Sequence, residues 1–303
     1  MSDILPRIEA FVKPILQDTA RPPIMGTPMN AQPAIPIPWI EKSPFRWLVY
    51  GLGGSILLAW LALTPGGLLG KADAVAYAVC HRIAAHSLSL GDRQLPLCAR
   101  CTGMYLGAVL GLGFQHFQGR RGSLPALRYV LLFGPMVVFF GVDGVNSYLH
   151  FFPHGISLYA PQNWLRLVSG TGMGLTISAV LAPAFRQTLW ETWEPIPAFS
   201  GLKPYLLLIG LAAGMDLLVL SGIPIILYPL ALLSAAGVLL LLGMIYTMVL
   251  VMLFKAENRF SRINGLKVFV VGGLILALLQ ISLLDAGRFW LTGTWQGFSL
   301  LLG

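Results

Sequence analysis

The feature that most constrains this chain is the recurrence of long apolar stretches bounded by charged or turn-forming residues. A helix that crosses a hydrocarbon core of about 30 Å needs roughly 20 such residues. Seven stretches approach that length, at residues 46–65, 101–118, 127–149, 163–185, 204–222, 224–254 and 266–285. Because a backbone in lipid must satisfy its own hydrogen bonds, these stretches are expected to be helical. We therefore predict an all-α, polytopic transmembrane helix bundle of about seven spans.

Composition points to the same class. Hydrophobic residues make up 56% of the 303 residues and charged residues only 11%, whereas a soluble domain carries about 25% charged residues. The formal net charge of +8 then indicates topology and contact with anionic lipid. Nucleic acid is excluded as a partner, because no basic run is interleaved with aromatic residues. We predict a multi-pass protein of the cell inner (plasma) membrane, with membrane lipids as partners.

The cations predict the orientation. By the positive-inside rule, the loops richest in Lys and Arg are cytoplasmic. These cations are Arg7, Lys13, Arg21, Lys42, Arg46, Arg120, Arg121, Arg128, Arg186, Lys203, Lys255, Arg259, Arg262 and Lys267. The N-terminus is therefore predicted to be cytoplasmic, with residues 66–100, 150–162 and the C-terminus outside. The first outer loop is an exception, since it carries Lys71, Arg82, Arg93 and Arg100. Cations placed against the trend suggest a local use for their charge.

The first 40 residues form a separate region. Apolar residues at positions 4, 5, 8, 11, 12, 15 and 16 recur at helical spacing, which is typical of a helix lying on a membrane surface or packed on the protein itself. Six prolines between positions 22 and 38 favour an extended linker. We predict a cytoplasmic amphipathic segment and Pro-rich linker over residues 1–40. The transmembrane domain then covers 41–303, with a Cys/His loop at 70–101.

The strongest local signal is the cysteines, since all three lie within 22 residues. Cys98 and Cys101 have the Cys-x-x-Cys spacing that fits two thiolates onto one tetrahedral metal, and Cys80 with His81 supplies a second pair. We predict a Cys3His site that binds one zinc-like ion. Because adjacent residues are strained in joint ligation, His86 is an alternative nitrogen ligand. The cations of the same loop would offset the charge of three thiolates.

Two other interpretations of the cysteines stay open. A Cys-x-x-Cys pair on the outer side meets an oxidising compartment in most bacteria. The chain would then be a membrane thiol-disulfide oxidoreductase that uses Cys98 and Cys101, with the third thiol passing the disulfide along. The cysteines could also be inert. Metal content discriminates between these interpretations.

A second signal is a set of polar residues inside apolar spans. Near the bilayer centre a charge costs at least about 2.5–3.5 kcal/mol, so such residues face a partner or a wet cavity. In the predicted topology they share the outer half of the membrane with the cysteines. They are Asp143, Asn146, Asn163, Arg166 and Asp216. We predict a polar pocket in which Asp143 and Arg166 are spatial partners of opposite charge. The alternative is that this ion pair only holds two spans together.

Small residues predict where helices pack closely. Gly103, Gly107 and Gly111 lie four apart in one predicted span, and Gly170 and Gly174 do so in another. This spacing lets helix backbones approach each other in lipid.

At these positions the sequence resembles a family of uncharacterised bacterial and archaeal membrane proteins, classed as a domain of unknown function. The resemblance covers roughly residues 70 to 185 and implies no established activity. It is carried by Cys80-His81, by Cys98-Ala99-Arg100-Cys101-Thr102-Gly103-Met104-Tyr105-Leu106-Gly107, by Asp143-Gly144, and by Asn163, Arg166, Gly170 and Gly174.

The leading hypothesis is a zinc-stabilised outer loop over a polar intramembrane pocket. The protein would act as an enzyme at the lipid interface or as an accessory subunit of a membrane complex. A zinc with four protein ligands has no open position for water. Catalysis would then fall to Asp143 as base and Arg166 as clamp for a lipid phosphate, with Asn146 and Asn163 beside them. A small-solute transporter is a third class, weakened by the lack of visible repeats.

Overall fold

The computed structural model describes residues 44–150, 157–197, 199 and 201–296. These residues all belong to one compact unit, Pro38–Gly303. The predicted amphipathic segment and proline-rich linker lie outside the described residues, so both stay predictions.

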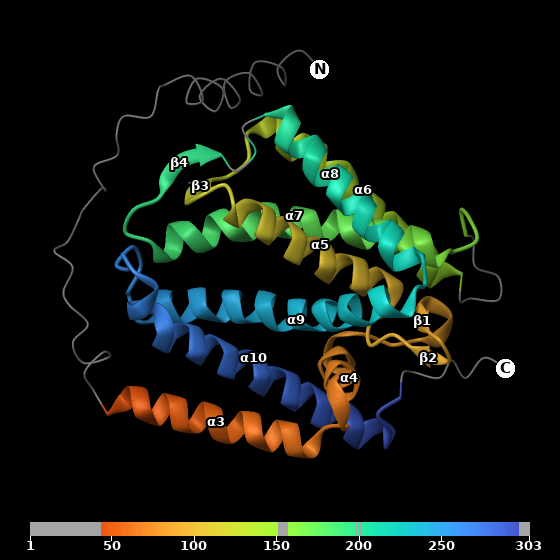
Figure 1. Ribbon diagram of the computed structural model, residues 1–303, viewed down its shortest axis with the longest axis horizontal. Helices are drawn as coiled ribbons and strands as arrows, with labels where there is room; N and C mark the ends of the chain where they lie inside the picture. The colour runs from red at the N-terminus through yellow and green to blue at the C-terminus, as the bar shows by residue number, and fades with distance from the viewer. Residues whose placement is uncertain (1–43, 151–156, 198, 200, 297–303) are drawn as a thin grey trace, which may run out of the picture. The chain divides into compact units, whose positions relative to one another are not determined.

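Helices dominate the described part of the chain, which confirms the all-α class (Figure 1). The helices are α3 (Phe45–Leu63), α4 (Gly67–Val79), α5 (Ala99–His116), α6 (Leu127–Leu149), α7 (Asn163–Leu189), α8 (Leu202–Leu220), α9 (Pro224–Leu253) and α10 (Ile263–Thr292), with a 3₁₀ turn at Ala84–His86. Two short strand pairs complete the fold. β1 (Ser89–Leu90) pairs antiparallel with β2 (Arg93–Gln94), and β3 (Arg121–Ser123) pairs parallel with β4 (Glu194–Pro197).

Six of these helices are long and apolar enough to cross a membrane, within the described residues. They are Phe45–Leu63, Tyr129–Leu149, Asn163–Leu189, Leu202–Leu220, Pro224–Leu253 and Ile263–Thr292. The remaining predicted span forms α5, which is less apolar because Arg100 stands in its first turn and Gln115 and His116 in its last. One helix was not predicted. The short α4 lies in the segment that the sequence indicated as the first outer loop.

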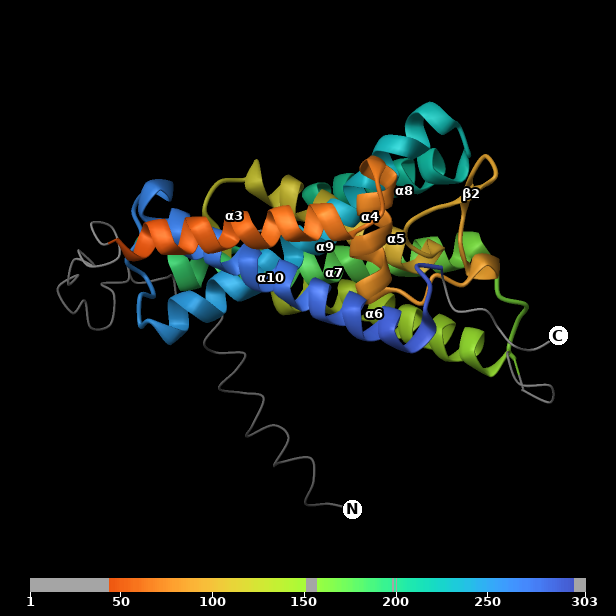
Figure 2. The same cartoon turned by 90° about the horizontal axis from the view of Figure 1, so that it is seen from below.

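The glycines bring α5 and α7 into backbone contact. A Cβ atom built on Gly107 would lie 2.5 Å from the Thr171 carbonyl oxygen, and one built on Gly103 or Gly170 would also meet backbone of the other helix. The predicted close packing is therefore confirmed, because these backbones approach to a distance that only glycine allows. At the edge of the bundle, α3 packs against α10 and leaves most of its apolar side chains exposed, as a lipid-facing helix does (Figures 1 and 2).

The loops gather at two ends of the bundle. At one, which we call the cysteine end, Asn163 at the start of α7 donates a hydrogen bond of 3.2 Å to the Ser87 carbonyl in the loop before α5. At the other, the backbone of Glu191 after α7 donates to that of Phe260 before α10 at 3.1 Å. Figure 1 shows the hairpin β1–β2 at the cysteine end and the pair β3–β4 at the other. Which end faces the cytoplasm stays a prediction.

Candidate metal centre and buried charged cluster

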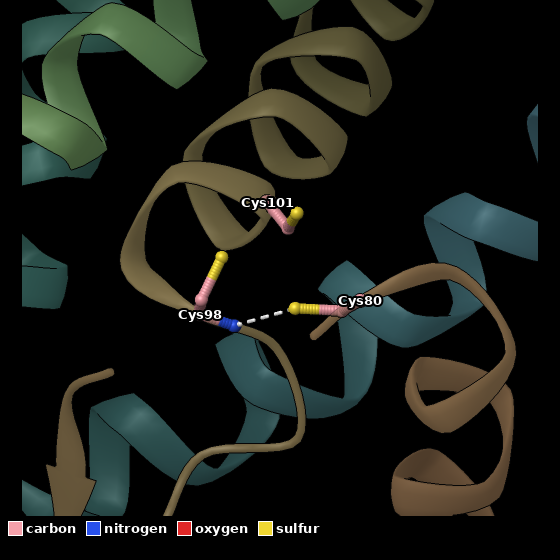
Figure 3. Close-up of side chains that lie close together, drawn as sticks. All are labelled: Cys80, Cys98 and Cys101. Atoms are coloured by element: carbon pink, nitrogen blue, oxygen red, sulfur yellow. Dashed lines mark hydrogen bonds between the residues drawn. The ribbon is translucent and has the colours of Figure 1, made fainter. Parts of the chain in front are cut away.

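Three thiols from two helix ends converge on one point. The Sγ atoms of Cys80, Cys98 and Cys101 all lie within 4.8 Å of one another (Figure 3). Cys80 caps the C-terminus of α4, Cys98 caps the N-terminus of α5, and Cys101 lies in the first turn of α5. All three are free thiols, and Cys80 and Cys98 are buried. The structure thus brings together three of the four predicted metal ligands.

Helix geometry explains how α5 supplies two of these thiols. Residues three apart lie on the same face of a helix, so Cys98 and Cys101 present their sulfurs together. Both stand at the N-terminal end of α5, Cys98 as its N-cap residue and Cys101 in its first turn. The Cys-x-x-Cys spacing therefore predicted the proximity of this pair.

Backbone amides reach the third sulfur. Cys98 N donates to Cys80 Sγ at 3.3 Å, and Arg82 N donates to it at 3.5 Å. Arg82 has a φ of 53°, a left-handed conformation that few non-glycine residues adopt. Backbone amide donors stabilise a sulfur that carries negative charge.

The hydrogen bonds among the thiols shift the pKa values of Cys80 and Cys98 in opposite directions. Hydrogen bonds from Cys101 and then Cys98 lower the pKa of Cys80 to about 2, against the effect of burial. For Cys98, the bond with Cys101 lowers the pKa, but the bond with Cys80 and burial outweigh it and raise the pKa to about 12. Ionisation of Cys80 is therefore favoured, and ionisation of Cys98 is disfavoured. A cation among the sulfurs would supply the charge that allows all three to ionise.

The predicted histidine ligand does not join the thiols. Among the described residues, the group that could hold a metal consists of the three cysteines alone. The backbone of Cys80 is extended (φ −131°, ψ 143°), and successive side chains on an extended backbone point to opposite sides. His81 therefore turns away, and its Nδ1 accepts a hydrogen bond of 3.0 Å from Ile83 N. The His86 ring packs edge-on against that of His81, with centroids 5.4 Å apart.

Burial lowers the pKa of both histidines, that of His86 to about 4. Each ring is therefore neutral at pH 7 and offers a lone pair, but the fold directs neither ring into the thiol group.

Arg288 of α10 anchors the loop that carries Cys80. Its guanidinium donates to the carbonyl oxygens of Tyr77 and Cys80, both at 2.6 Å, and to that of His81 at 3.2 Å. It also stacks over the Tyr77 ring, 4.0 Å from the centroid. Arg288 was not among the predicted site residues. Arg288 lies beyond the predicted 266–285 span, and no local pattern connects it with a loop some 200 positions earlier.

Three cations of the loop that was predicted to be the first outer one have direct partners other than the thiols. Arg82 and Arg93 both pair with Asp73, at 2.8 and 2.5 Å, and Lys71 Nζ donates to the Thr64 carbonyl at 2.9 Å. These contacts fix the loop in place. These cations were predicted to offset the charge of the thiolates. Their closest contacts are instead with Asp73 and Thr64.

Beside the thiols lies a buried charged cluster centred on Asp143, a residue with no exposed surface. Its carboxylate accepts hydrogen bonds from Tyr159 Oη at 2.9 Å and from Ser169 Oγ at 3.2 Å. It also forms an ion pair with Arg100, whose Nε lies 3.1 Å from Oδ2. Arg100 donates in addition to Ser147 Oγ at 3.0 Å. This one carboxylate therefore joins α5, α6, α7 and the segment before α7.

Asp143 and Arg166 lie in the same buried region, but the ion pair expected between them does not form. In the described part of the chain, the ion-pair partner of Asp143 is Arg100, which the first turn of α5 directs away from the thiols and toward α6. Arg166 is buried nearby and donates to Asn163 Oδ1 at 2.8 Å, three residues back on its own helix. Arg100 was not predicted as the partner of Asp143, because the predicted span began at residue 101 and left Arg100 in the preceding loop.

The two predicted amides fasten loops to helices. Asn146 donates to the Tyr159 carbonyl at 2.9 Å and accepts from Leu158 N at 2.7 Å, so it fixes the segment before α7. Asn163 joins α7 to the Ser87 carbonyl. Asp216 belongs to a different place, because its Oδ1 accepts from Thr171 Oγ1 at 2.7 Å between α7 and α8.

The comparisons with known proteins match this same region. Residues 80–180 match the family model described as "Predicted membrane protein (DUF2085)", about a third of the chain. The chain is also similar to an uncharacterized protein, MJ1492, of Methanocaldococcus jannaschii, with 24% identity over 118 residues that cover 38% of this chain and 69% of the relative. No solved structure matches. The expected resemblance to uncharacterised membrane proteins is thus confirmed, and with the apolar helices it identifies a multi-pass membrane protein.

Proposed function

We propose that this multi-pass membrane protein binds one zinc ion through the thiolates of Cys80, Cys98 and Cys101, as a structural centre that holds the loop before α5 onto the bundle. The observation that carries the proposal is the convergence of three free sulfurs within 4.8 Å of one another. Chance does not account for it, since these are all the cysteines of the chain.

The donor set favours zinc. Thiolates select soft or borderline ions such as Zn²⁺ over Mg²⁺ or Ca²⁺, and zinc accepts tetrahedral sulfur ligation at about 2.3 Å. Sulfurs on such a tetrahedron lie about 3.8 Å apart, from the same bond length. The three sulfurs need only small shifts to reach that separation from their present limit of 4.8 Å.

The charged cluster supports a structural role for this end of the protein. Asp143 is fully buried and is already bonded to Arg100, Tyr159 and Ser169. A general base needs a free lone pair within reach of its substrate, so Asp143 is a poor base in this arrangement. We therefore favour an accessory subunit of a membrane complex over a lipid-interface enzyme that relies on Asp143.

One observation favours a second candidate. Three thiolates leave one tetrahedral position for water or a substrate oxygen, which is the ligand count of catalytic zinc sites. Zinc-dependent hydrolysis at the lipid interface is therefore the alternative. Replacement of zinc by cobalt distinguishes the two candidates. At a catalytic centre the fourth position is accessible, so added phosphate or azide should change the visible spectrum of the cobalt protein, whereas at a structural centre shielded from solvent the spectrum should not change.

Metal analysis tests the proposal. Protein purified in mild detergent should carry about one zinc per chain, with sulfur at about 2.3 Å by X-ray absorption. Cys98→Ser and Cys101→Ser should each lose the ion. His81→Gln and His86→Gln are the matched controls, and both should keep it because neither ring faces the sulfurs.

One result of the same experiment would contradict the zinc proposal. A metal-free preparation with a Cys98–Cys101 disulfide, in protein that retains its helical circular dichroism, would refute the metal centre. That outcome would support the thiol-disulfide oxidoreductase instead.

A further inference from the structure

A groove separate from the thiols and the charged cluster lies between α6, α7 and α8. Its volume is about 420 Å³, within the range of about 300–1,000 Å³ that small-molecule sites occupy. Figure 2 shows α7 between α6 and α8. The walls are almost wholly apolar, and they include Met136, Phe139, Trp164, Leu217 and Leu220.

The groove is closed at one end and open at the other. Away from the cysteine end, α6 and α8 touch, since the rings of Phe133 and Tyr205 pack edge-on with centroids 5.6 Å apart. Toward the cysteine end the two helices diverge, and the walls end at Trp164 in the first turn of α7 and at Leu220, the last residue of α8. Trp164 and Leu217 expose 52% and 69% of their surface. The cleft therefore faces lipid and runs from the membrane interface toward its middle.

One carboxyl group lies in this apolar cleft. Asp216 lines the groove and has 6% of its surface exposed. Thr171 Oγ1 donates to its Oδ1 at 2.7 Å. Of the described residues that line the groove, Asp216 is the one with an ionisable side chain. A carboxyl group at membrane depth is costly without a partner, and Thr171 supplies a single neutral hydrogen bond.

Position along the helix places this carboxyl near the membrane surface. Asp216 precedes the end of α8 by four residues, or about 6 Å at the helical rise of 1.5 Å per residue. A head group at the interface can therefore reach it while an acyl chain lies along the cleft below.

We propose that this groove binds a membrane lipid with an ammonium-bearing head group, with the acyl chain against the apolar walls and the ammonium on Asp216. Charge determines which head group fits. An anionic head group that carries no ammonium would be repelled by the Asp216 carboxylate. It would also find no Lys, Arg or His among the described residues that line the groove. A primary ammonium offers three donors and would form a charge-assisted hydrogen bond with the carboxylate.

Native mass spectrometry of the full-length protein tests the proposal. The probes are dioleoyl phosphatidylethanolamine and dioleoyl phosphatidylglycerol, which share their acyl chains and differ in the ammonium. The aminolipid should bind at least tenfold more tightly. Asp216→Asn keeps the size and the bond to Thr171 but removes the charge, so it should bring the aminolipid down to the affinity of the glycerol lipid.

Two further variants complete the design. Ala213→Phe fills the groove beside the carboxyl and should weaken binding of both lipids. Asp92→Asn, in the exposed turn of the β1–β2 hairpin, removes a carboxylate elsewhere and should change neither. Equal binding of the two lipids by the unmodified protein would overturn the proposal. So would an aminolipid preference that survives Asp216→Asn.

Discussion

The close approach of α5 and α7 predicts that Gly107 does not tolerate even a methyl group. A Cβ atom at Gly107 would lie 2.5 Å from the Thr171 carbonyl oxygen, whereas ordinary contact begins near 3.4 Å. The two backbones would have to separate by the difference, about 0.9 Å. That movement loosens the neighbouring glycine contacts as well, because Gly103 and Gly170 lie on the same interface. Overpacking of this kind costs about 1–3 kcal/mol.

A matched control lies on the same helix. A Cβ at Gly113 meets nothing within 4 Å, so Gly113→Ala should gain about 0.5–1 kcal/mol from the lower backbone entropy of the unfolded chain. Gly107→Ala gains the same helix propensity but loses the interface, and should be destabilised by about 1–2 kcal/mol net. The two substitutions, each of which adds one methyl group, are thus predicted to change the free energy of unfolding in opposite directions.

Thermal unfolding in detergent, followed by tryptophan fluorescence, measures both variants. Gly107→Ala should lower the midpoint and Gly113→Ala should leave it unchanged or raise it. If Gly107→Ala unfolds at or above the midpoint of the unmodified protein, then the backbones of α5 and α7 are not in contact at Gly107, and the glycine spacing does not mark close packing.

Three other predictions follow from the contacts at the cysteine end. Arg100→Gln and Asp143→Asn should each destabilise the protein, and a double-mutant cycle of their unfolding free energies should give a coupling of about 1–3 kcal/mol; additive effects would exclude the ion pair. Arg288→Gln should weaken zinc binding about 10- to 100-fold in a chelator competition, because the Cys80 carbonyl loses its donor; unchanged affinity would show that the anchor is dispensable. In intact cells an impermeant thiol reagent should label Asp92→Cys above the background of the unmodified chain but not Glu191→Cys, both exposed; the reverse pattern would invert the predicted topology.

Local patterns in the sequence were enough to predict the long helices of this fold, although not the short α4. Apolar length predicted the membrane helices because lipid forces every backbone group to bond within its own segment. Glycine spacing predicted the α5–α7 contact, since the period of the pattern is the period of the helix. The Cys98–Cys101 pair was predictable for the same reason, as both residues share one helical turn. In each case the relevant interaction partner lies within a few residues or on a repeating face.

The tertiary structure alone decided which long-range partners meet. Shared depth in the membrane led to the prediction that Asp143 and Arg166 are partners. Depth does not specify which way a side chain points around its helix axis. In the structure, α5 directs Arg100 toward the Asp143 carboxylate, and these two residues form the ion pair. Adjacency in sequence suggested that Cys80 and His81 act together, whereas the extended backbone between them points their side chains apart. Arg288 reaches the cysteine loop only because α10 returns to the same end. A sequence states how residues repeat along an element, while packing determines which faces of distant elements are turned toward each other.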